Sequence, residues 1–458
     1  MSATLYFYGG AGAVTGSNFL LDTGGTKILV DCGLRQGAGE AENWKDFAYD
    51  PKEVSHLFIT HAHIDHIGRV PKLVRDGFAG KIISTHATRA LAEPLLLDAM
   101  ELMAHDAEIQ GRPPLYEAKD IAQAMQQWEV HSYHEKMSLP GGVTLEFLDS
   151  GHILGSAMVR VTRPSTTLGV KGSRNIVFSS DLGGGNSPLL SPAEAVRDAT
   201  YLVIESVYGD RTRQDEDRRE RLEDVIEETA ARGGSLLIPA FSTERTQDLL
   251  FEIRTLMVEK RIPTMPVYVD SPLAQKMTEA FLRCPEYFAP TMRARVAAGE
   301  DIFNFPQLHF AQTLPESQAI VGVPAPKIVL AGSGMGGGGR VGTHQAAVLP
   351  DKNSTYLVVG YQAAGTPGRR LLEGAKALTL RHGSIPVRCK IEALYGYSAH
   401  MDGEDLLQFA NHTAERAEEI FVVHAEPAAA AFLVQRIRDY LYVKATAPEA
   451  GDKVVLNF

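Results

Sequence analysis

The stretch "ITHAHIDHIG" (residues 59–68) most constrains how this chain can fold. It places His61, His63, Asp65 and His66 within six positions, directly after the apolar run "HLFI". Imidazole and carboxylate groups are the usual zinc ligands, and a short loop after a strand can aim several of them at two adjacent cations. We therefore expect a strand that ends in a metal-binding loop. The alternative is an ordinary polar turn.

Three further ligand candidates follow apolar runs elsewhere in the chain. They are His152 in "DSGHILGS", Asp181 in "VFSSDLGG" and His424 in "FVVHAE". Each alone is more typical of a turn residue, but strand ends at one sheet edge can project their side chains toward the same loop. Together with residues 61–66 they supply seven ligands, enough for two zinc ions with one bridging aspartate, as a two-metal hydrolase requires.

The chain is expected to form two domains, because its 458 residues exceed what one hydrophobic core usually supports. The first part shows short strand-like runs such as "TLYFYG", "KILVDCG" and "HLFIT". Residues 87–110 and 117–128 are predicted helices, the first interrupted by Pro94.

A change in the pattern of predicted helices and strands indicates where the second domain lies. From about residue 206 the chain alternates helices with buried-looking strands such as "SLLIPA" and "KIVLAGSG", and after about residue 385 the earlier style returns. We therefore predict an α/β insertion domain at 207–384, placed inside a first domain that comprises 1–206 and is completed by 385–458.

Composition limits the cellular context and the partners. No apolar stretch is long enough to span a bilayer, and the start "MSATLYFYGGAGAV" lacks the features of a signal peptide. We therefore expect no membrane partner. The cysteines Cys32, Cys284 and Cys389 are odd in number and widely spaced, which favours a reducing cytoplasm over a disulfide framework. The net charge of −11 argues against a protein that coats nucleic acid, but it allows a nucleic-acid enzyme with local positive charge.

Two sets of motifs resemble known families. "HAHIDH", "DCG", "GHILGS", "SSD" and "VVHAE", in this order, resemble the metallo-β-lactamase fold. "ESVYGD" (205–210), "IPAFSTERTQ", "AGSGMGGGGR", "GYQAAGTPGRRLLEG" and "YSAHMDG" resemble its β-CASP branch, whose members are nucleic-acid processing nucleases related to the mRNA 3′-end cleavage endonuclease and RNase J. The resemblance implies an α/β protein with a four-layered αββα metal domain and an inserted β-CASP domain that closes over it.

The resemblance also implies which residues bind two zinc ions. His61, His63 and His152 would bind the first ion, and Asp65, His66 and His424 the second. Asp181 would bridge both ions. Asp31 of "LVDCG" would orient ligands, as metal-bound imidazoles generally require. A buried structural carboxylate is the alternative for Asp31.

The implied reaction is hydrolysis of a phosphodiester to a 5′-phosphate and a 3′-hydroxyl. His400 in "YSAHMDG" would be the general acid that protonates the leaving O3′, held by a hydrogen bond to Glu205, because an alkoxide leaves poorly and a histidine can deliver a proton near neutral pH. The metal pair would activate water for in-line attack. The implied catalytic residues are thus His400, Glu205, Asp65 and Asp31.

His424 favours RNA as the substrate, because RNA-processing members of the branch have a histidine at this position and DNA-repair members lack it. Single-stranded RNA is thus the expected substrate, while exonuclease or endonuclease preference and homo-oligomerisation stay open. Two other classes are alternatives. A thioesterase or lactonase would not need the insertion or His400, and a silent scaffold would have lost ligands, whereas none is missing.

Substrate-holding residues are expected in the insertion. The glycine-rich stretch 332–340 is either a phosphate cradle or an ordinary flexible loop. The residues expected to hold the substrate are Ser333, Arg340, Arg369, Arg370, Ser398 and Arg245. Two positions depart from the family pattern: Glu244 and Ala425 each replace a usual glycine. "GGAGAVTGS" (9–17) superficially resembles a dinucleotide fingerprint, but its glycine spacing excludes that function.

Overall fold

The computed structural model describes residues 2–164, 173–212, 217–360, 362, 365–380 and 383–458. The chain forms two compact units. The first comprises Met1–Gly185, Ser191–Thr212 and Ala399–Phe458, and the second comprises Asn186–Leu190 and Arg213–Ser398. Tyr361, Ala363 and Ala364 of the motif "GYQAAGTPGRRLLEG" lie outside the described residues. None of the helices seen in the described ranges has both the length and the apolar character that crossing a membrane requires.

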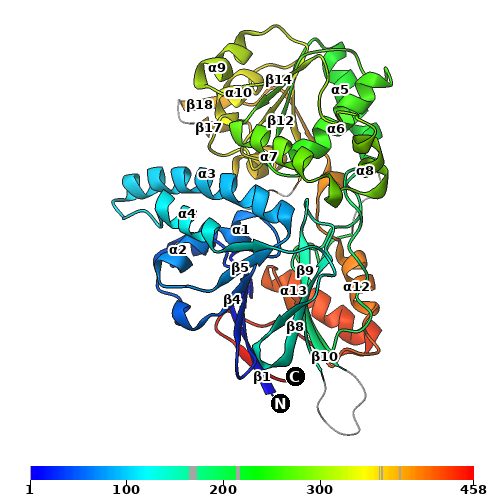
Figure 1. The fold of residues 1–458 in the computed structure, drawn as a ribbon. Coiled ribbons are helices and arrows are strands. Elements are labelled where there is room, and N and C mark those ends of the chain that lie inside the picture. The colour runs from blue at the N-terminus through cyan, green and yellow to red at the C-terminus, as the bar shows by residue number, and fades with distance from the viewer. Residues whose placement is uncertain (1, 165–172, 213–216, 361, 363–364, 381–382) are drawn as a thin grey trace. The chain divides into compact units, whose positions relative to one another are not determined.

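Two seven-stranded sheets form the centre of the first unit (Figure 1). The first sheet has the order β22-β1-β2-β3-β4-β5-β6. Its strands are β1 (Ser2–Gly9), β2 (Asn18–Asp22), β3 (Lys27–Val30), β4 (His56–Phe58), β5 (Lys81–Ser84), β6 (Trp128–Val130) and β22 (Lys453–Asn457). Strand β1 alternates buried and half-buried residues, the pattern of a strand with one face on a core.

The second sheet has the order β21-β20-β11-β10-β9-β8-β7. Its strands are β7 (Met137–Leu139), β8 (Val143–Asp149), β9 (Ala157–Arg163), β10 (Arg174–Phe178), β11 (Tyr201–Glu205), β20 (Glu419–Val423) and β21 (Ala445–Thr446). One apolar cluster contains residues of both sheets, including Phe7, Phe147 and Phe178, so the two sheets pack face to face.

Helices cover the outer faces of both sheets. On the first sheet these are α1 (Ile64–Ile67), α2 (Val70–Arg75), α3 (His86–Gln110) and α4 (Ala118–Gln126), and on the second they are α12 (Gly403–Asn411) and α13 (Pro427–Arg436). A second apolar cluster joins α12 and α13 to β10, β11 and β20. The predicted αββα layering is thus confirmed. The predicted interruption at Pro94 is wrong, because α3 continues through this residue.

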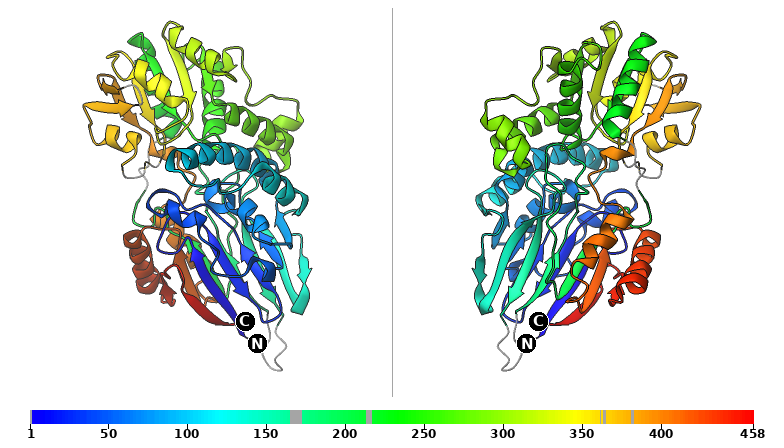
Figure 2. Two further views of the ribbon diagram at one scale, coloured as in Figure 1. Left: turned by 90° about the vertical axis from the view of Figure 1, so that its left-hand side faces the viewer. Right: turned by 90° about the vertical axis from the view of Figure 1, so that its right-hand side faces the viewer.

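The chain termini lie side by side in the first unit, as both views in Figure 2 show. The last strand β22 runs antiparallel to β1, with Ser2 opposite Asn457. The C-terminal segment also supplies β20, which pairs in parallel with β11 along its whole length. Segments from both ends of the sequence therefore complete the unit that carries most of the predicted site.

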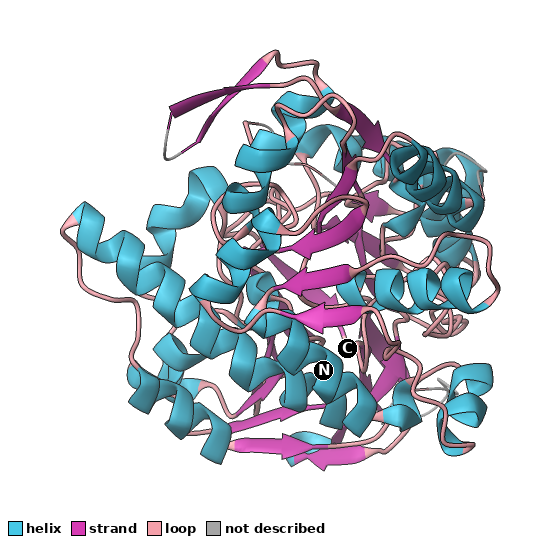
Figure 3. Ribbon diagram, turned by 90° about the horizontal axis from the view of Figure 1, so that it is seen from above, coloured by secondary structure: helices cyan, strands magenta, loops and turns pink. Residues whose placement is uncertain are grey.

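The second unit is built on one six-stranded parallel sheet of order β14-β13-β15-β12-β16-β19. Its strands are β12 (Ser235–Pro239), β13 (Val267–Asp270), β14 (Leu308–Phe310), β15 (Lys327–Ala331), β16 (Thr355–Val358) and β19 (Lys390–Ala393). Every residue of β12 and β15 is buried, as expected for central parallel strands covered on both faces. Seen from above, cyan helices flank magenta strands on both sides (Figure 3).

The helices of the second unit are α5 (Arg218–Ala231), α6 (Arg245–Val258), α7 (Pro272–Arg283), α8 (Pro290–Ala297), α9 (Leu314–Gly322), α10 (Val341–Val348) and α11 (Pro367–Leu372). A separate hairpin joins β17 (Ala377–Leu380) to β18 (Gly383–Pro386). Strand β19 pairs with β16, so this unit continues to Ser398. The second unit therefore ends at Ser398, whereas the sequence pattern placed the end of the inserted domain at residue 384.

Candidate metal centre

The predicted ligand loop follows β4 and opens α1. Strand β4 ends at Phe58, His61 lies in the connection, His63 is the N-cap of α1, and Asp65 and His66 lie in its first turn. Helix α1 is a single short turn, and its residues His66 and Ile67 are buried. The motif thus places its side chains at the end of a buried strand, as the sequence predicted.

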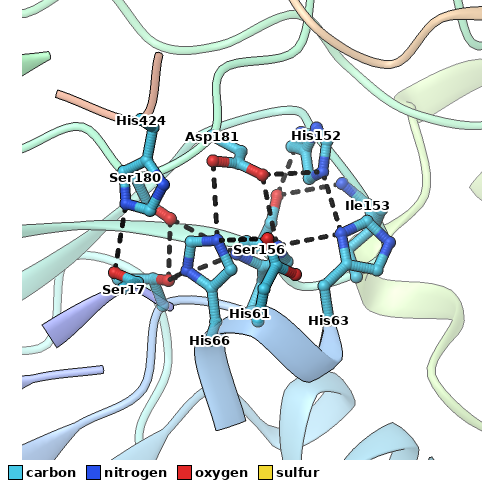
Figure 4. A network of polar contacts seen from close by, with 12 residues as sticks. Ser17, His61, His63, His66, His152, Ile153, Ser156, Ser180, Asp181 and His424 are labelled. Carbon is cyan, nitrogen blue, oxygen red and sulfur yellow. Dashed lines mark hydrogen bonds and ion pairs between the residues drawn. The ribbon is translucent and has the colours of Figure 1, made fainter. Parts of the chain in front are cut away.

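Four ligand atoms form the first group (Figure 4). Nε2 of His61 lies 3.0 Å from Nδ1 of His63, and Nε2 of His152 lies 3.2 Å from the same atom. Oδ2 of Asp181 lies 3.6 Å from Nε2 of His61 and 3.4 Å from Nε2 of His152. These four donor atoms lie within 4.8 Å of one another and can bind one divalent cation.

A second group meets the first at Asp181. Its other oxygen, Oδ1, lies 3.6 Å from Nε2 of His66, and His424 completes this group within 4.8 Å. The rings of His66 and His424 stack with centroids 5.0 Å apart. Asp65 lies at the edge of the group, with Oδ2 3.9 Å from Nε2 of His66. The carboxylate of Asp181 therefore faces both groups, one oxygen to each.

The donor atoms fit a metal better than they fit one another. Among the described residues, Nε2 of His66 and Oδ1 of Asp181 are buried and accept or donate no hydrogen bond, which is costly in a protein interior. Burial and the neighbouring imidazoles hold the pKa values of His61, His66 and His152 well below the usual range, so their ring nitrogens stay neutral and able to bind a cation. Burial also raises the pKa of Asp181 well above its usual value.

Asp31 lies behind the second group and does not belong to it. Its Oδ2 accepts a 2.7 Å hydrogen bond from Nδ1 of His66, which leaves Nε2 of that ring facing Asp181. The backbone N–H of Thr60 and the hydroxyl of Ser17 also donate to its carboxylate. Burial raises the pKa of Asp31 to about 7, although these hydrogen bonds act in the opposite direction.

The N-terminal loop 9–17 holds His424, which the sequence analysis did not predict. The backbone N–H of His424 donates to the carbonyl of Gly10, and its Nδ1 lies 3.1 Å from the carbonyl of Val14. A Cβ atom on Gly10 would lie 2.8 Å from the imidazole, so a side chain there would displace the ring. The glycine run, which is no dinucleotide fingerprint, thus packs against a ligand candidate. Its glycine content was the available signal.

Strained backbone follows three strands that meet at the site. Asp31 after β3, Ser180 after β10 and His424 after β20 have φ angles of 60°, 52° and 48°. Residues with side chains rarely adopt this left-handed conformation, and its cost is tolerated where the surrounding structure fixes it, often at functional sites. The strain is therefore concentrated at the cluster of ligand candidates.

His400 lies beside the first group and is bonded to Glu205. Its Nδ1 is 3.0 Å from Oε1 of Glu205, whose buried carboxylate also accepts hydrogen bonds from the backbone N–H groups of Leu182 and Val207. The ring of His400 lies 4.6 Å from that of His152, centroid to centroid. Burial lowers the pKa of His400, but the charge and hydrogen bond of Glu205, together with nearby carboxylates, raise it to about 9.

The expected substrate-holding residues all lie in the second unit. The guanidinium of Arg340 is held by the Asp270 carboxylate at 2.8 Å and by the carbonyls of Ala311 and Gln312, so its contacts are internal to this unit. Ser333 donates to the carbonyl of Gly337 within the glycine-rich loop, at a distance of 2.5 Å.

The other expected holding residues have different surroundings. Arg245 is buried beside Asp248, and Ser398 ends the unit. Arg369 pairs with Glu373 at 2.7 Å, and Arg370 is exposed on the same short helix α11. Of the predicted arginines, the pair on α11 is the more accessible to a ligand.

Sequence-family comparisons agree with this fold and site. The model of the metallo-β-lactamase superfamily matches residues 11–263, that of the Beta-Casp domain matches 246–371, and that of the Zn-dependent metallo-hydrolase RNA specificity domain matches 384–448. The chain belongs to the β-CASP family of the metallo-β-lactamase superfamily and is a metallo-hydrolase. The resemblance that the motifs indicated is thus confirmed.

Two curated relatives extend over most of the chain. Ribonuclease TTHA0252 of Thermus thermophilus is 34% identical over 421 residues, covering 92% of each chain. Transcription termination factor FttA of Methanosarcina mazei is 30% identical over 454 residues, covering 96% of this chain and 69% of its own. A solved structure, a protein of unknown function from Enterococcus faecalis V583, has a TM-score of 0.60 at 13% identity over the whole of both chains, which shows the fold alone.

Proposed function

We propose that the protein is a zinc-dependent ribonuclease that hydrolyses single-stranded RNA by a two-metal mechanism, leaving 5′-phosphate and 3′-hydroxyl ends. One observation carries the proposal: the two oxygens of Asp181 face two separate groups of imidazoles. A carboxylate in this position can bridge two cations. RNA as the substrate is supported by the names of the ribonuclease relative and of the RNA specificity model.

The two metal sites follow from the donor groups. His61, His63 and His152 would hold one zinc ion, and His66 and His424, with Asp65 at the edge, the other. Two bound zinc ions would lower the pKa of a water molecule and stabilise negative charge on the phosphate oxygens. Asp31 would keep the His66 ring in one tautomer, with Nε2 available to the metal.

His400 would protonate the leaving O3′ of the RNA. Because Glu205 accepts from Nδ1, the protonated ring keeps a second N–H at Nε2 that can be donated. The charge and hydrogen bond of Glu205 raise the pKa of this imidazole, which favours the protonated form, and Glu205 fixes its orientation. Arg369 and Arg370 would contact RNA phosphates, since they place two positive charges on α11 in an acidic chain.

Metal analysis coupled to RNA cleavage tests the proposal. The purified protein should carry about two zinc ions per chain. It should cleave an internally labelled, 5′-monophosphorylated single-stranded RNA. A phosphatase should remove the 5′-phosphate of the products, and periodate should oxidise their 3′ ends, because those ends carry a free hydroxyl and not a 3′-phosphate.

The asparagine variant of the bridging residue, Asp181→Asn, should lose both metal and cleavage. Faster turnover of simple thioesters or lactones than of RNA would instead identify a small-molecule hydrolase. Full metal content without cleavage of any RNA would identify a silent scaffold. Either result would overturn the proposal.

A further inference from the structure

Helix α6 of the second unit carries an acidic residue at each of three successive turns of one buried face. Glu244 is the N-cap of the helix, and Asp248 and Glu252 follow at four-residue spacing. All three side chains are almost fully buried, at 2%, 1% and 4% exposure. Three buried acids on one helix face are costly unless charged or polar partners hold them. We call these residues the α6 acidic row.

The partners of the α6 acidic row come from three separate parts of the second unit. Ser187, in the short segment Asn186–Leu190, donates to Asp248 at 2.7 Å and to Glu244 at 3.2 Å. Arg218, in the first turn of α5, donates to Glu252 at 2.8 Å.

Tyr397, just before the chain leaves the second unit at Ser398, donates its hydroxyl to the other oxygen of Glu252. One face of α6 therefore holds the short segment Asn186–Leu190, the start of α5 and the last residues of the second unit.

Tyr397 is the most firmly held of these partners. Its side chain has no exposed surface, and the guanidinium of Arg218 lies 4.7 Å from its ring centroid. Arg218 also donates to the carbonyl of Gly396, so the backbone beside the tyrosine is held as well. Burial and the negative charge of Glu252 raise the pKa of Tyr397 well above its usual range, which keeps the hydroxyl protonated as a donor.

The chain is fixed again directly after His400. The backbone of His400 bridges to that of Gly183, and the N–H of Met401 donates to the carbonyl of Leu182 at 2.8 Å. Leu182 also donates its own N–H to Glu205, the partner of the His400 ring. Between Tyr397 and His400 only Ser398 and Ala399 intervene. The segment that carries the imidazole is thus anchored on both sides.

We propose that Tyr397, held by Glu252 and Arg218, is a positioning residue for His400. Its anchored hydroxyl limits where the chain can place the imidazole, and a displacement of about 1 Å in a proton donor can reduce turnover about a hundred-fold. The inference rests on the proposed role of His400 as general acid. It adds the α6 acidic row to the residues on which proton delivery depends.

Tyr397→Phe tests the inference, since it removes only the hydroxyl and keeps the ring against Arg218. We expect kcat for RNA cleavage to fall about ten- to a hundred-fold, with KM and zinc content unchanged. Tyr356→Phe is the matched control: Tyr356 is equally buried in the same unit, and its hydroxyl accepts a hydrogen bond from Gln345. The control variant should keep its kcat, even if both variants lose thermal stability.

Two further measurements separate positioning of His400 from a structural role. The double variant Tyr397→Phe/His400→Ala should be no slower than His400→Ala alone, because both changes remove the same proton delivery. On an RNA with sulfur in place of the scissile 3′-bridging oxygen, whose thiolate leaves without a proton, the Tyr397→Phe defect should disappear. If the losses in kcat of the two single variants add up in the double variant, Tyr397 does not act through His400. The same conclusion follows if the Tyr397→Phe defect persists on the sulfur substrate while the His400→Ala defect disappears. Either result would refute the role of Tyr397 and leave that of His400 intact.

A different result would refute the premise. If His400→Ala itself shows no loss that depends on the leaving group, the proposed general acid is wrong and Tyr397 has no proton delivery to support. The two proposals therefore fail in distinguishable ways. Unchanged kcat in Tyr397→Phe, with His400→Ala behaving as expected, would overturn only the further inference.

Discussion

Nδ1 of His66 lies 2.7 Å from Oδ2 of Asp31, and the other nitrogen of the same ring faces Asp181. The carboxylate thus selects which imidazole nitrogen is available to a metal. We predict that Asp31→Asn lowers the affinity of the His66 site for zinc about 10- to 100-fold, because partners of metal-bound histidines commonly contribute this much. Zinc titration against a competing chelator measures the change.

The matched control for Asp31→Asn is Asp120→Asn. Asp120 is also buried, but it accepts the backbone N–H of Glu117 at the start of α4 and lies in no ligand group. Its variant should keep the zinc affinity of the parent protein. Equal affinities in both variants and the parent would show that Asp31 is a structural carboxylate only.

The sequence predicted which side chains gather at the site better than which backbone groups support them. Histidines and aspartates that follow apolar runs are visible as a pattern, because strand ends at one sheet edge converge. Val14 and Gly10 hold His424 through backbone carbonyls, which any residue type can supply, so the glycine content of this loop is their one sequence signal. The return of the first domain was expected after about residue 385, but strand β19 (Lys390–Ala393) joins the second unit through pairing with the distant strand β16, which the local pattern does not specify.

His424→Ala should reduce the zinc content from about two ions toward one. His424 belongs to the group that contains His66, whereas the other group of His61, His63 and His152 stays complete without it. Elemental analysis of the purified variant measures the ratio. His412→Ala removes a histidine at the C-cap of α12 and should keep both ions. Two ions in His424→Ala would exclude His424 from the ligand set.

RNA cleavage should weaken strongly with added salt despite the acidic composition. If Arg369 and Arg370 contact phosphates, replacing both with alanine should raise KM more than it lowers kcat. It should also reduce the slope of log KM against log salt by about 0.7 per lost contact on single strands. The control pair, Arg219 and Arg221 on α5, carries the same charge change. An equal slope in both double variants would place the RNA path elsewhere.

Glu244 occupies a backbone conformation that favours glycine, with φ 65° and ψ −59° at the start of α6. The glycine that the family resemblance leads one to expect at this position would adopt this conformation without strain. We predict that Glu244→Gly is more stable than Glu244→Ala by about 1 kcal/mol or more, since both remove the carboxylate but only glycine relieves the strain. Denaturant unfolding of the two variants measures the difference, and an alanine variant of equal or greater stability would contradict it.

The last prediction separates proton delivery from metal binding at His400. Its Nδ1 is bonded to Glu205, and its ring lies beside His152; it shares Asp181, but no histidine, with the two metal groups. His400→Ala should therefore keep both zinc ions and lose roughly 10²–10⁴-fold in rate, the usual contribution of a positioned proton donor. Glu205→Gln should lose less, because glutamine still accepts a hydrogen bond from the ring. With a thiophilic metal supplied, RNA carrying the 3′-bridging sulfur should be cleaved by His400→Ala almost as fast as by the parent protein. An undiminished defect on that RNA, with both metals bound, would mean that His400 holds the substrate and that another group donates the proton.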